Sequence, residues 1–310
     1  MSQTAEILKV DVEGGQLAVH DLSGGPARHG APVVLAAHGI TANGLMWRPI
    51  ADELVRRRGP GAVRFLAPDL RGRGASNTVT GPFGLGCHAA DLVAVAAEVG
   101  DCPVLVGHSM GAFIAGLTAA TAPGSFRSAV LVDGGLAFPA PADLDIDAAL
   151  QAVIGPAMQR LGMRFEGPEA YLAFWAQHPA LGPALQGPQG DAIRDYVRHD
   201  LVEDGEGGWR STCVLDAIRA DGADVLADQR THGAVAEAVS HGVPVEFLWA
   251  HRGLLDEPQG LYDEGRLAAL DVPSEVRVSE VDANHYTVVL DEPGVSAVVD
   301  AIERQLDAVR

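Results

Sequence analysis

One five-residue stretch, Gly107-His108-Ser109-Met110-Gly111, constrains this chain more than any other. It follows the apolar run 102–106, which is typical of a buried strand, and it precedes the run 112–120, which is typical of a helix. A strand that turns directly into a helix strains the backbone of its central residue, and only small neighbours let the two elements pass closely. The G-x-S-x-G pattern in this context therefore predicts a sharp turn that presents the Ser109 hydroxyl at the end of a strand.

Short apolar runs alternate with helical patterns through the first 132 residues of the chain. The predicted strands are 7–12, 16–22, 32–37, 63–67, 102–106 and 128–132. The first two form a hairpin, and the alternation that follows predicts an α/β fold with a mostly parallel sheet covered by helices on both faces. Ligands bind beyond the carboxyl ends of such strands. Four polar residues fall at those ends, namely His38, Asp69, Ser109 and Asp133.

The strand pattern disappears between residues 136 and 241. Prolines recur there, much of the aromatic content lies there, and four helical stretches are predicted at 144–161, 168–177, 191–202 and 212–226. Strand patterns return at 243–250 and 275–281, before a final helix at 294–309. We therefore expect a core domain in two parts, 1–135 and 242–310, with a helical cap at 136–241 inserted between them.

Composition narrows the classes of function. The net charge of −19 disfavours nucleic acid and anionic membrane surfaces as partners. Three cysteines without C-x-x-C spacing suit a reducing compartment, and neither a signal peptide nor a membrane-spanning run is visible, so we expect a cytoplasmic protein. No cluster has metal-ligand spacing, and we expect no metal or cofactor. The expected partner is a small-molecule substrate, and the sequence does not indicate an oligomeric state.

A serine hydroxyl becomes a good nucleophile only when a base takes its proton and a third group holds that base. His285 fits the base, because it follows the predicted strand 275–281. Two carboxylates at strand ends fit the third group. We prefer Asp256, and Asp133 is the alternative; either residue gives the order Ser, Asp, His along the chain. Asp133 has a second interpretation, as a residue that caps the amides of Gly134-Gly135.

Negative charge that develops during attack on a carbonyl needs two backbone N–H donors. The amides of Met110 and Ile40 are the predicted donors, on position alone. His38 either ties loops together or lines the substrate pocket. Three cap residues, Phe174, Trp175 and Met158, either line an apolar pocket or only pack the cap.

Taken together, these motifs resemble the α/β-hydrolase fold family over nearly the whole chain. The matching pieces are His38-Gly39, Asp69 to Gly74, Gly107 to Gly111, Gly253 to Asp256, and Asn284-His285. The resemblance implies an eight-stranded, mostly parallel sheet with one antiparallel strand near the start and a cap after the sixth strand. It also implies the serine-nucleophile, esterase- or lipase-like branch. One departure is that His251-Arg252 separate Gly253 from its strand.

The expected function is hydrolysis of a carboxylic-ester-type bond in a small, largely apolar substrate through an acyl-enzyme. The same three residues could instead cleave a lactone, thioester, amide or carbon–carbon bond. A third possibility, from another class, is a ligand receptor on this fold that has no turnover.

Overall fold

The computed structural model describes residues 6–100, 102–139 and 145–308. Its main element is an eight-stranded sheet in the order β1-β2-β4-β3-β5-β6-β9-β10. The strands are β1 (Glu6–Val12), β2 (Gly15–Asp21), β3 (Val33–Ala37), β4 (Arg64–Pro68), β5 (Val104–His108), β6 (Ser128–Val132), β9 (Val245–Arg252) and β10 (Arg277–Asn284). β2 runs antiparallel to both its neighbours, β1 and β4, and all other pairings in this sheet are parallel, as the family resemblance implied.

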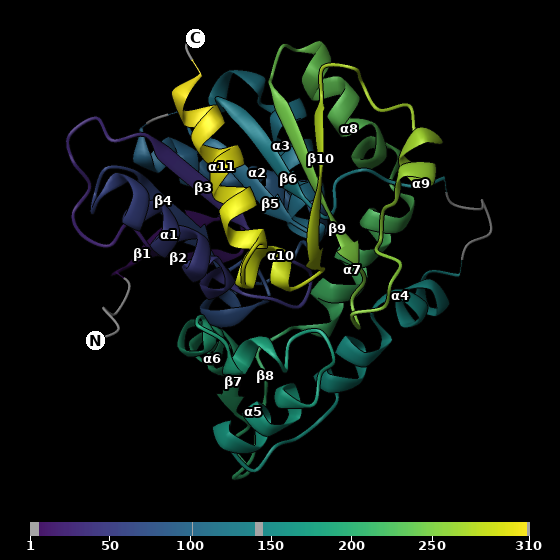
Figure 1. Cartoon of the computed structure of the whole chain (residues 1–310). Helices are drawn as coiled ribbons and strands as arrows, with labels where there is room; N and C mark the ends of the chain where they lie inside the picture. The colour runs from purple at the N-terminus through teal and green to yellow at the C-terminus, as the bar shows by residue number, and fades with distance from the viewer. Residues whose placement is uncertain (1–5, 101, 140–144, 309–310) are drawn as a thin grey trace.

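Helices cover both faces of this sheet (Figure 1). One face packs against α1 (Arg48–Arg58), α10 (Thr287–Leu290) and α11 (Gly294–Asp307), and the other against α2 (Leu85–Val99), α3 (Met110–Thr121) and α8 (Gln229–Ser240). Successive strand residues serve opposite faces, so Val104 and Val106 belong to one buried cluster and Leu105 to the other. The continuous apolar runs are explained by this double burial.

The sequence of the last helix, α11, has apolar residues at the spacing that one buried helix face requires. Its buried residues recur at helical spacing, namely Val295, Val298, Val299, Ile302 and Leu306. Helix α11 therefore places one apolar stripe on the sheet. It begins at Gly294 as predicted and ends at Asp307, whereas Val309, the predicted end, lies outside the described residues.

The segment between β6 and β9 contains the four predicted helices and two features that the sequence pattern did not predict. The helices are α4 (Ile146–Leu161), α5 (Pro168–Ala176), α6 (Gly190–His199) and α7 (Leu215–Ala227). Leu144, the predicted start of the first helix, lies outside the described residues. The unpredicted features are α8 and a hairpin of β7 (Leu201–Glu203) and β8 (Trp209–Ser211).

Helix α8 changes the expected boundary of the cap. Its Ala234, Val235 and Ala238 are buried in the same cluster as Leu117 of α3. The helix is therefore part of the layer on the sheet and leads into β9, so the cap ends before α8 instead of at residue 241. The remaining short elements are α9 (Glu264–Ala268), η1 (Gly44–Trp47), η2 (Gly74–Ser76), η3 (Pro123–Ser125) and η4 (Ala184–Gln186).

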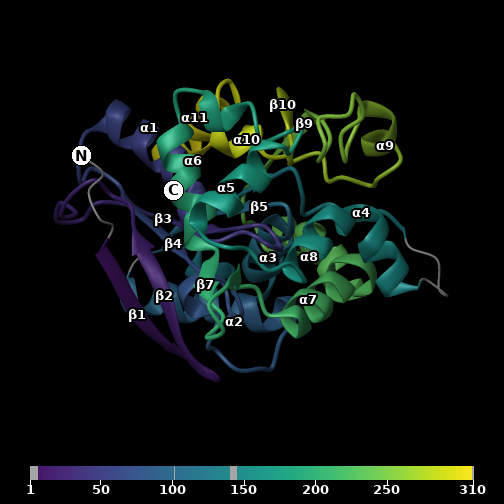
Figure 2. The ribbon, with the colours of Figure 1, turned by 90° about the horizontal axis from the view of Figure 1, so that it is seen from below.

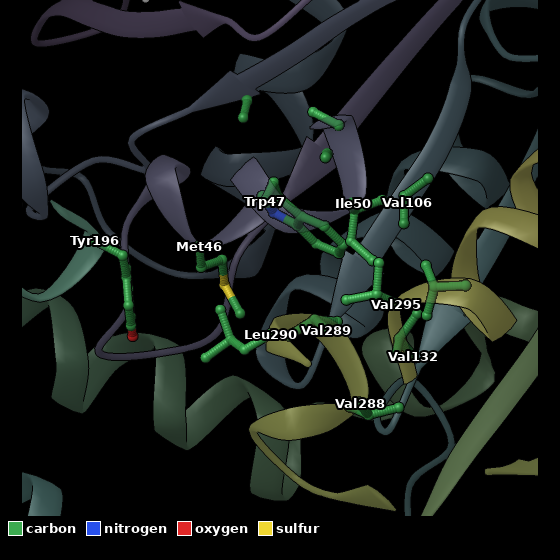
Figure 3. Packing of buried hydrophobic residues seen from close by; sticks show 14 of the residues in the cluster. Met46, Trp47, Ile50, Val106, Val132, Tyr196, Val288, Val289, Leu290 and Val295 are labelled. Atoms are coloured by element: carbon green, nitrogen blue, oxygen red, sulfur yellow. The ribbon is translucent and has the colours of Figure 1, made fainter. Parts of the chain in front are cut away.

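The cap lies across the carboxyl ends of the strands, as Figure 1 shows from the side and Figure 2 from below. Its foot is α6, where Tyr196 belongs to the same buried cluster as Met46, Trp47 and Leu290 (Figure 3). The Asn43 side chain also donates a hydrogen bond to the Tyr196 carbonyl at 3.0 Å. The cap is thus joined to the core by apolar packing at this point. Among the described residues, the structure has no helix that combines the length and apolar character needed to cross a membrane.

Candidate active site

Ser109 lies at the turn between β5 and α3, in a backbone conformation that side chains rarely adopt (φ 55°, ψ −123°). A Cβ atom on Gly107 would lie 2.1 Å from the Gly111 carbonyl oxygen, and one on Gly111 would lie 2.1 Å from that of Ala37. Both glycines are therefore required by close approach of backbone to backbone. The predicted sharp strand-to-helix turn is confirmed.

His285 directly follows β10 and is held by a buried carboxylate. Its Nδ1 lies 2.6 Å from Oδ2 of Asp133, which follows β6 and is fully buried. The other carboxylate oxygen, Oδ1, accepts the Ala250 backbone N–H at 3.0 Å. The carboxylate is thus fixed at both ends, and it holds His285 in the tautomer with its proton on Nδ1. The Nε2 atom of the ring is then the one that can take a proton from a nucleophile.

The preference for Asp256 as the residue that holds His285 is wrong. Its side chain is 43% exposed, and its Oδ1 accepts hydrogen bonds from Arg252 Nε (2.9 Å) and Asn284 Nδ2 (3.0 Å). These bonds, the one from Asn284 foremost, lower the pKa of Asp256. The physical reason is strand length. Strand β9 continues to Arg252, which moves the next loop outward, whereas β6 pairs directly with β5 and brings Asp133 beside the serine turn.

His108 lies against His285, and Gly134 lies against Ser109. The His108 ring lies 4.6 Å from the His285 ring, and His108 Nε2 donates to the His285 carbonyl at 2.8 Å. Burial holds the pKa of His108 well below its ordinary value, so that ring is neutral. A Cβ atom on Gly134, next to Asp133, would lie 2.2 Å from the Ser109 carbonyl oxygen.

Among the described residues, no hydrogen bond joins the Ser109 hydroxyl to His285. His285 makes its own hydrogen bonds through Nδ1 and its backbone. Contacts of this kind are often long without substrate and tighten when it binds. The geometry therefore holds the Asp133 carboxylate against the His285 ring, and it places Ser109 next to Asp133.

A cavity of about 550 Å³ opens beside the serine. Ser109, Asp133 and both predicted donors, Ile40 and Met110, line it. Its other walls are mostly apolar and come from core and cap alike, including Phe113, Leu136, Leu150, Ile154, Val225, Leu226 and Leu261. The predicted oxyanion residues thus line the same, mostly apolar cavity as Ser109.

The four residues predicted for the substrate pocket do not line this cavity. His38 is fully buried, and its ring links two loops: Nε2 accepts the Leu70 N–H at 2.9 Å and Nδ1 donates to the Gly39 carbonyl at 2.8 Å. Burial lowers the pKa of His38 to about 3, which keeps the ring neutral and able to accept. The alternative role, that of tying loops together, is therefore the one the structure supports.

The three cap residues pack the cap itself. Phe174 and Trp175 belong to a group of aromatic rings with Phe165 and Tyr171, at centroid distances of 4.7–6.4 Å. Met158 packs against a separate small cluster of Leu150, Ile154, Cys213 and Ile218. Aromatic and aliphatic side chains of a cap bury one another as readily as they line a pocket, which is why composition did not separate the two roles.

Arg73 is a positioning residue that the sequence analysis did not single out, although it lies in the matched stretch Asp69 to Gly74. Its Nε donates to the Ile40 carbonyl at 2.9 Å, and its Nη2 lies 3.9 Å from the Met110 sulfur. Its Nη1 pairs with Asp221 of α7 at 2.5 Å, and both side chains are fully buried. Burial alone would raise the pKa of Asp221, but the charges of His88 and Arg73 outweigh it and keep that pKa low. Arg73 thus ties both predicted oxyanion residues to the cap.

We expect Arg73→Gln to lower the free energy of unfolding by about 3–5 kcal/mol, because it leaves Asp221 with reduced compensation for its burial. Urea denaturation followed by circular dichroism measures this change. The matched control is Arg164→Gln, which removes an arginine from an exposed pair with Asp204 and should change the midpoint little. If the two substitutions changed the free energy of unfolding equally, Arg73 would not tie the predicted oxyanion residues to the cap as described.

Two proteins of known function are similar in sequence to parts of this chain. Lipase LipV of Mycobacterium tuberculosis is 35% identical over 114 residues, which cover 36% of this chain and 39% of the lipase. N-formylmaleamate deformylase of Pseudomonas putida is 30% identical over 177 residues, which cover 53% of this chain and 61% of the deformylase. The chain thus matches less than two thirds of the length of either relative.

Solved structures extend the likeness to the whole fold. The crystal structure of E-2-(acetamidomethylene)succinate hydrolase superposes with a TM-score of 0.67 at 23% identity, covering 98% of this chain and all of the other. The profile of the α/β hydrolase fold family matches residues 32–291, which is most of the chain. With the sheet order, the serine turn and the cap already described, the conclusion is that this chain belongs to the α/β-hydrolase fold family.

Proposed function

We propose that the protein is a serine hydrolase that cleaves a carboxylic-ester-type bond through an acyl-enzyme. The observation that carries the proposal is the buried pair of Asp133 and His285, 2.6 Å apart, next to a serine on a strained turn. Buried, hydrogen-bonded polar groups that meet beside a cavity are typical of catalytic sites. Membership in a hydrolase family supports the same conclusion.

The proposed reaction has two halves. Ser109 Oγ attacks the substrate carbonyl while its proton passes to His285 Nε2, and the amides of Ile40 and Met110 donate to the oxygen that becomes negative. The tetrahedral intermediate collapses, and His285 returns the proton to the departing alcohol. Water then attacks the acyl-enzyme with His285 as base, which releases the acid and restores the Ser109 hydroxyl. Asp133 stays ionised throughout and stabilises the imidazolium.

Hydrolysis of a p-nitrophenyl ester, followed by release of p-nitrophenolate, tests the proposal directly. Labelling by a fluorophosphonate probe tests the serine separately, because the probe reacts with activated serine hydroxyls. We expect both turnover and one label per chain. A protein that shows neither would be a ligand receptor on this fold and would end the enzyme hypothesis.

The apolar cavity supports an apolar acyl group as the preferred substrate. Each methylene buried on binding stabilises by about 0.8 kcal/mol, so four added methylenes raise kcat/KM by up to about 200-fold. We expect p-nitrophenyl hexanoate to exceed the acetate in this way. Leu226 lines the cavity, and Leu226→Trp should remove most of the gain with hexanoate while the acetate rate changes little.

The matched control is Leu255→Trp, because Leu255 is 44% exposed and is not among the residues that line the cavity. Its kcat/KM values for both esters should equal those of the wild type. A Leu226→Trp enzyme with the wild-type preference for hexanoate would show that the acyl group binds elsewhere.

A second candidate is cleavage of a formamide bond by the same residues. The observation that favours it is the match to a deformylase over 53% of this chain. Formate release from an N-formyl amide, measured with formate dehydrogenase, separates this reaction from ester hydrolysis. The candidate fails when esters are cleaved and formate release stays at the buffer rate.

A further inference from the structure

Three side chains from distant parts of the chain meet where the cap joins the core. His20 lies on β2, Asp69 directly follows β4, and His199 is the last residue of α6. His20 Nε2 lies 3.1 Å from Asp69 Oδ2, and His199 Nε2 lies 2.7 Å from the same oxygen. His20 and Asp69 are buried, whereas the His199 side chain is 22% exposed. None of the three belongs to the active site described above.

One oxygen atom in this group faces more donors than it can accept. Asp69 Oδ1 accepts the Gly44 N–H at 2.8 Å. Oδ2 accepts the Ala75 N–H at 2.8 Å and is bonded to His199 Nε2, which together occupy its two lone pairs. His20 Nε2 is close to Oδ2 but outside hydrogen-bond geometry, and it is a buried nitrogen without a partner among the described residues. A buried polar atom left in this state calls for an explanation.

A cation among these atoms would remove the conflict, because each imidazole could then offer a lone pair in place of a proton. We propose that His20, Asp69 and His199 bind one zinc ion through Nε2, Oδ2 and Nε2. Two imidazoles and a carboxylate are a ligand set that zinc accepts. The three atoms already lie within 4.8 Å of one another.

The two distances to the Asp69 oxygen are close to those of a zinc site. Zinc bonds of about 2.0–2.2 Å in tetrahedral geometry put ligand atoms roughly 3.3 Å apart. The pair of His20 and Asp69, at 3.1 Å, is near this value. The pair of His199 and Asp69 has to open by about half an ångström, and His199 is the partly exposed residue at the end of a helix. Its exposed side also gives water access to the fourth position.

The ion would link β2, the end of β4 and the foot of the cap. Asp69 meanwhile keeps its bond to Gly44, which lies shortly after the predicted oxyanion residue Ile40. The role is structural, since the ion holds cap to core, and it does not depend on the proposed hydrolysis.

The test uses the full chain without a histidine tag, dialysed against a chelator and then titrated with zinc chloride in a calorimeter. We expect one equivalent of zinc to bind and the thermal midpoint to rise with zinc. His20→Gln and His199→Gln should each weaken binding at least about 100-fold, since even partners outside the ligand shell are worth about 10–100-fold. The matched control is His251→Gln, because His251 is exposed and pairs with Glu280 far along the chain from the group. It should bind zinc as the wild type does.

The test relies on the two histidine variants and not on a change of Asp69, because that change would also remove the acceptor of the Gly44 and Ala75 N–H groups. Circular dichroism confirms that each variant is folded. The proposal is overturned if the wild type binds no zinc. The close contact of His199 with Asp69 is then an ordinary hydrogen bond. The proposal is equally overturned when either variant binds zinc as tightly as the wild type.

Discussion

Ser109→Ala should lower kcat for p-nitrophenyl esters by about 10⁴-fold or more and leave the fold intact. The substitution removes one oxygen atom, and alanine carries the same backbone strain at φ 55° as serine does. Loss of that oxygen removes the acyl-enzyme route altogether. Fluorophosphonate labelling should disappear in parallel, and the thermal midpoint, measured by differential scanning fluorimetry, should stay near that of the wild type.

His285→Ala should have an effect of the same size, and the double variant should be no slower than either single one. Residues that act as one unit are strongly non-additive, because the loss of either disables the same step. The matched control is Ser240→Ala, which removes an exposed hydroxyl bonded to the Glu237 carbonyl on α8. A Ser109→Ala enzyme that keeps a tenth of the wild-type rate would contradict the proposed role.

Asp133→Asn should lower kcat by about 10³–10⁴-fold, although the side chain keeps its size. The Ala250 N–H needs an acceptor where Oδ1 now lies, so the asparagine oxygen takes that position and its NH₂ group faces His285 Nδ1. The imidazole must then accept at Nδ1 and carry its proton on Nε2. In that tautomer it cannot take the proton of Ser109.

Asp256→Asn is the matched control for this experiment. Its carboxylate orders a loop through Arg252 and Asn284 and does not contact the imidazole, so we expect kcat within about threefold of the wild type. Rates measured across pH for both variants separate a tautomer effect from a loss of fold. If Asp256→Asn proved the more damaging change, the acid of the site would have to be reassigned to Asp256.

Much of the fold could be predicted because local signals and burial coincide. The run at 129–132 is apolar throughout since both its faces are covered, and the glycines at 107 and 111 are required by backbone contacts. Each of these features is determined by a short segment of the sequence. The same holds for Ser109, whose role depends on its immediate neighbours.

The carboxylate that contacts His285 and the residues that line the cavity could not be predicted, because both depend on distances between separate stretches of the chain. Choosing between Asp133 and Asp256 needs the length of β9 and the identity of the strand beside β5, and neither follows from local pattern. Phe174 and Trp175 are apolar whether they face a substrate or each other. The structure shows that they pack edge to face within the cap, while the cap residues that line the cavity come from α4 and α7.

The burial of Tyr196 in the core limits how caps can be exchanged between related proteins. Because this residue of α6 is buried with Trp47 and Leu290 of the core, the cap is not a module that can be cut out whole. Removing it would open the interior beneath η1 and α10 to water. Recombination that exchanges caps between relatives would therefore have to retain α6 and replace only the segments on either side of it.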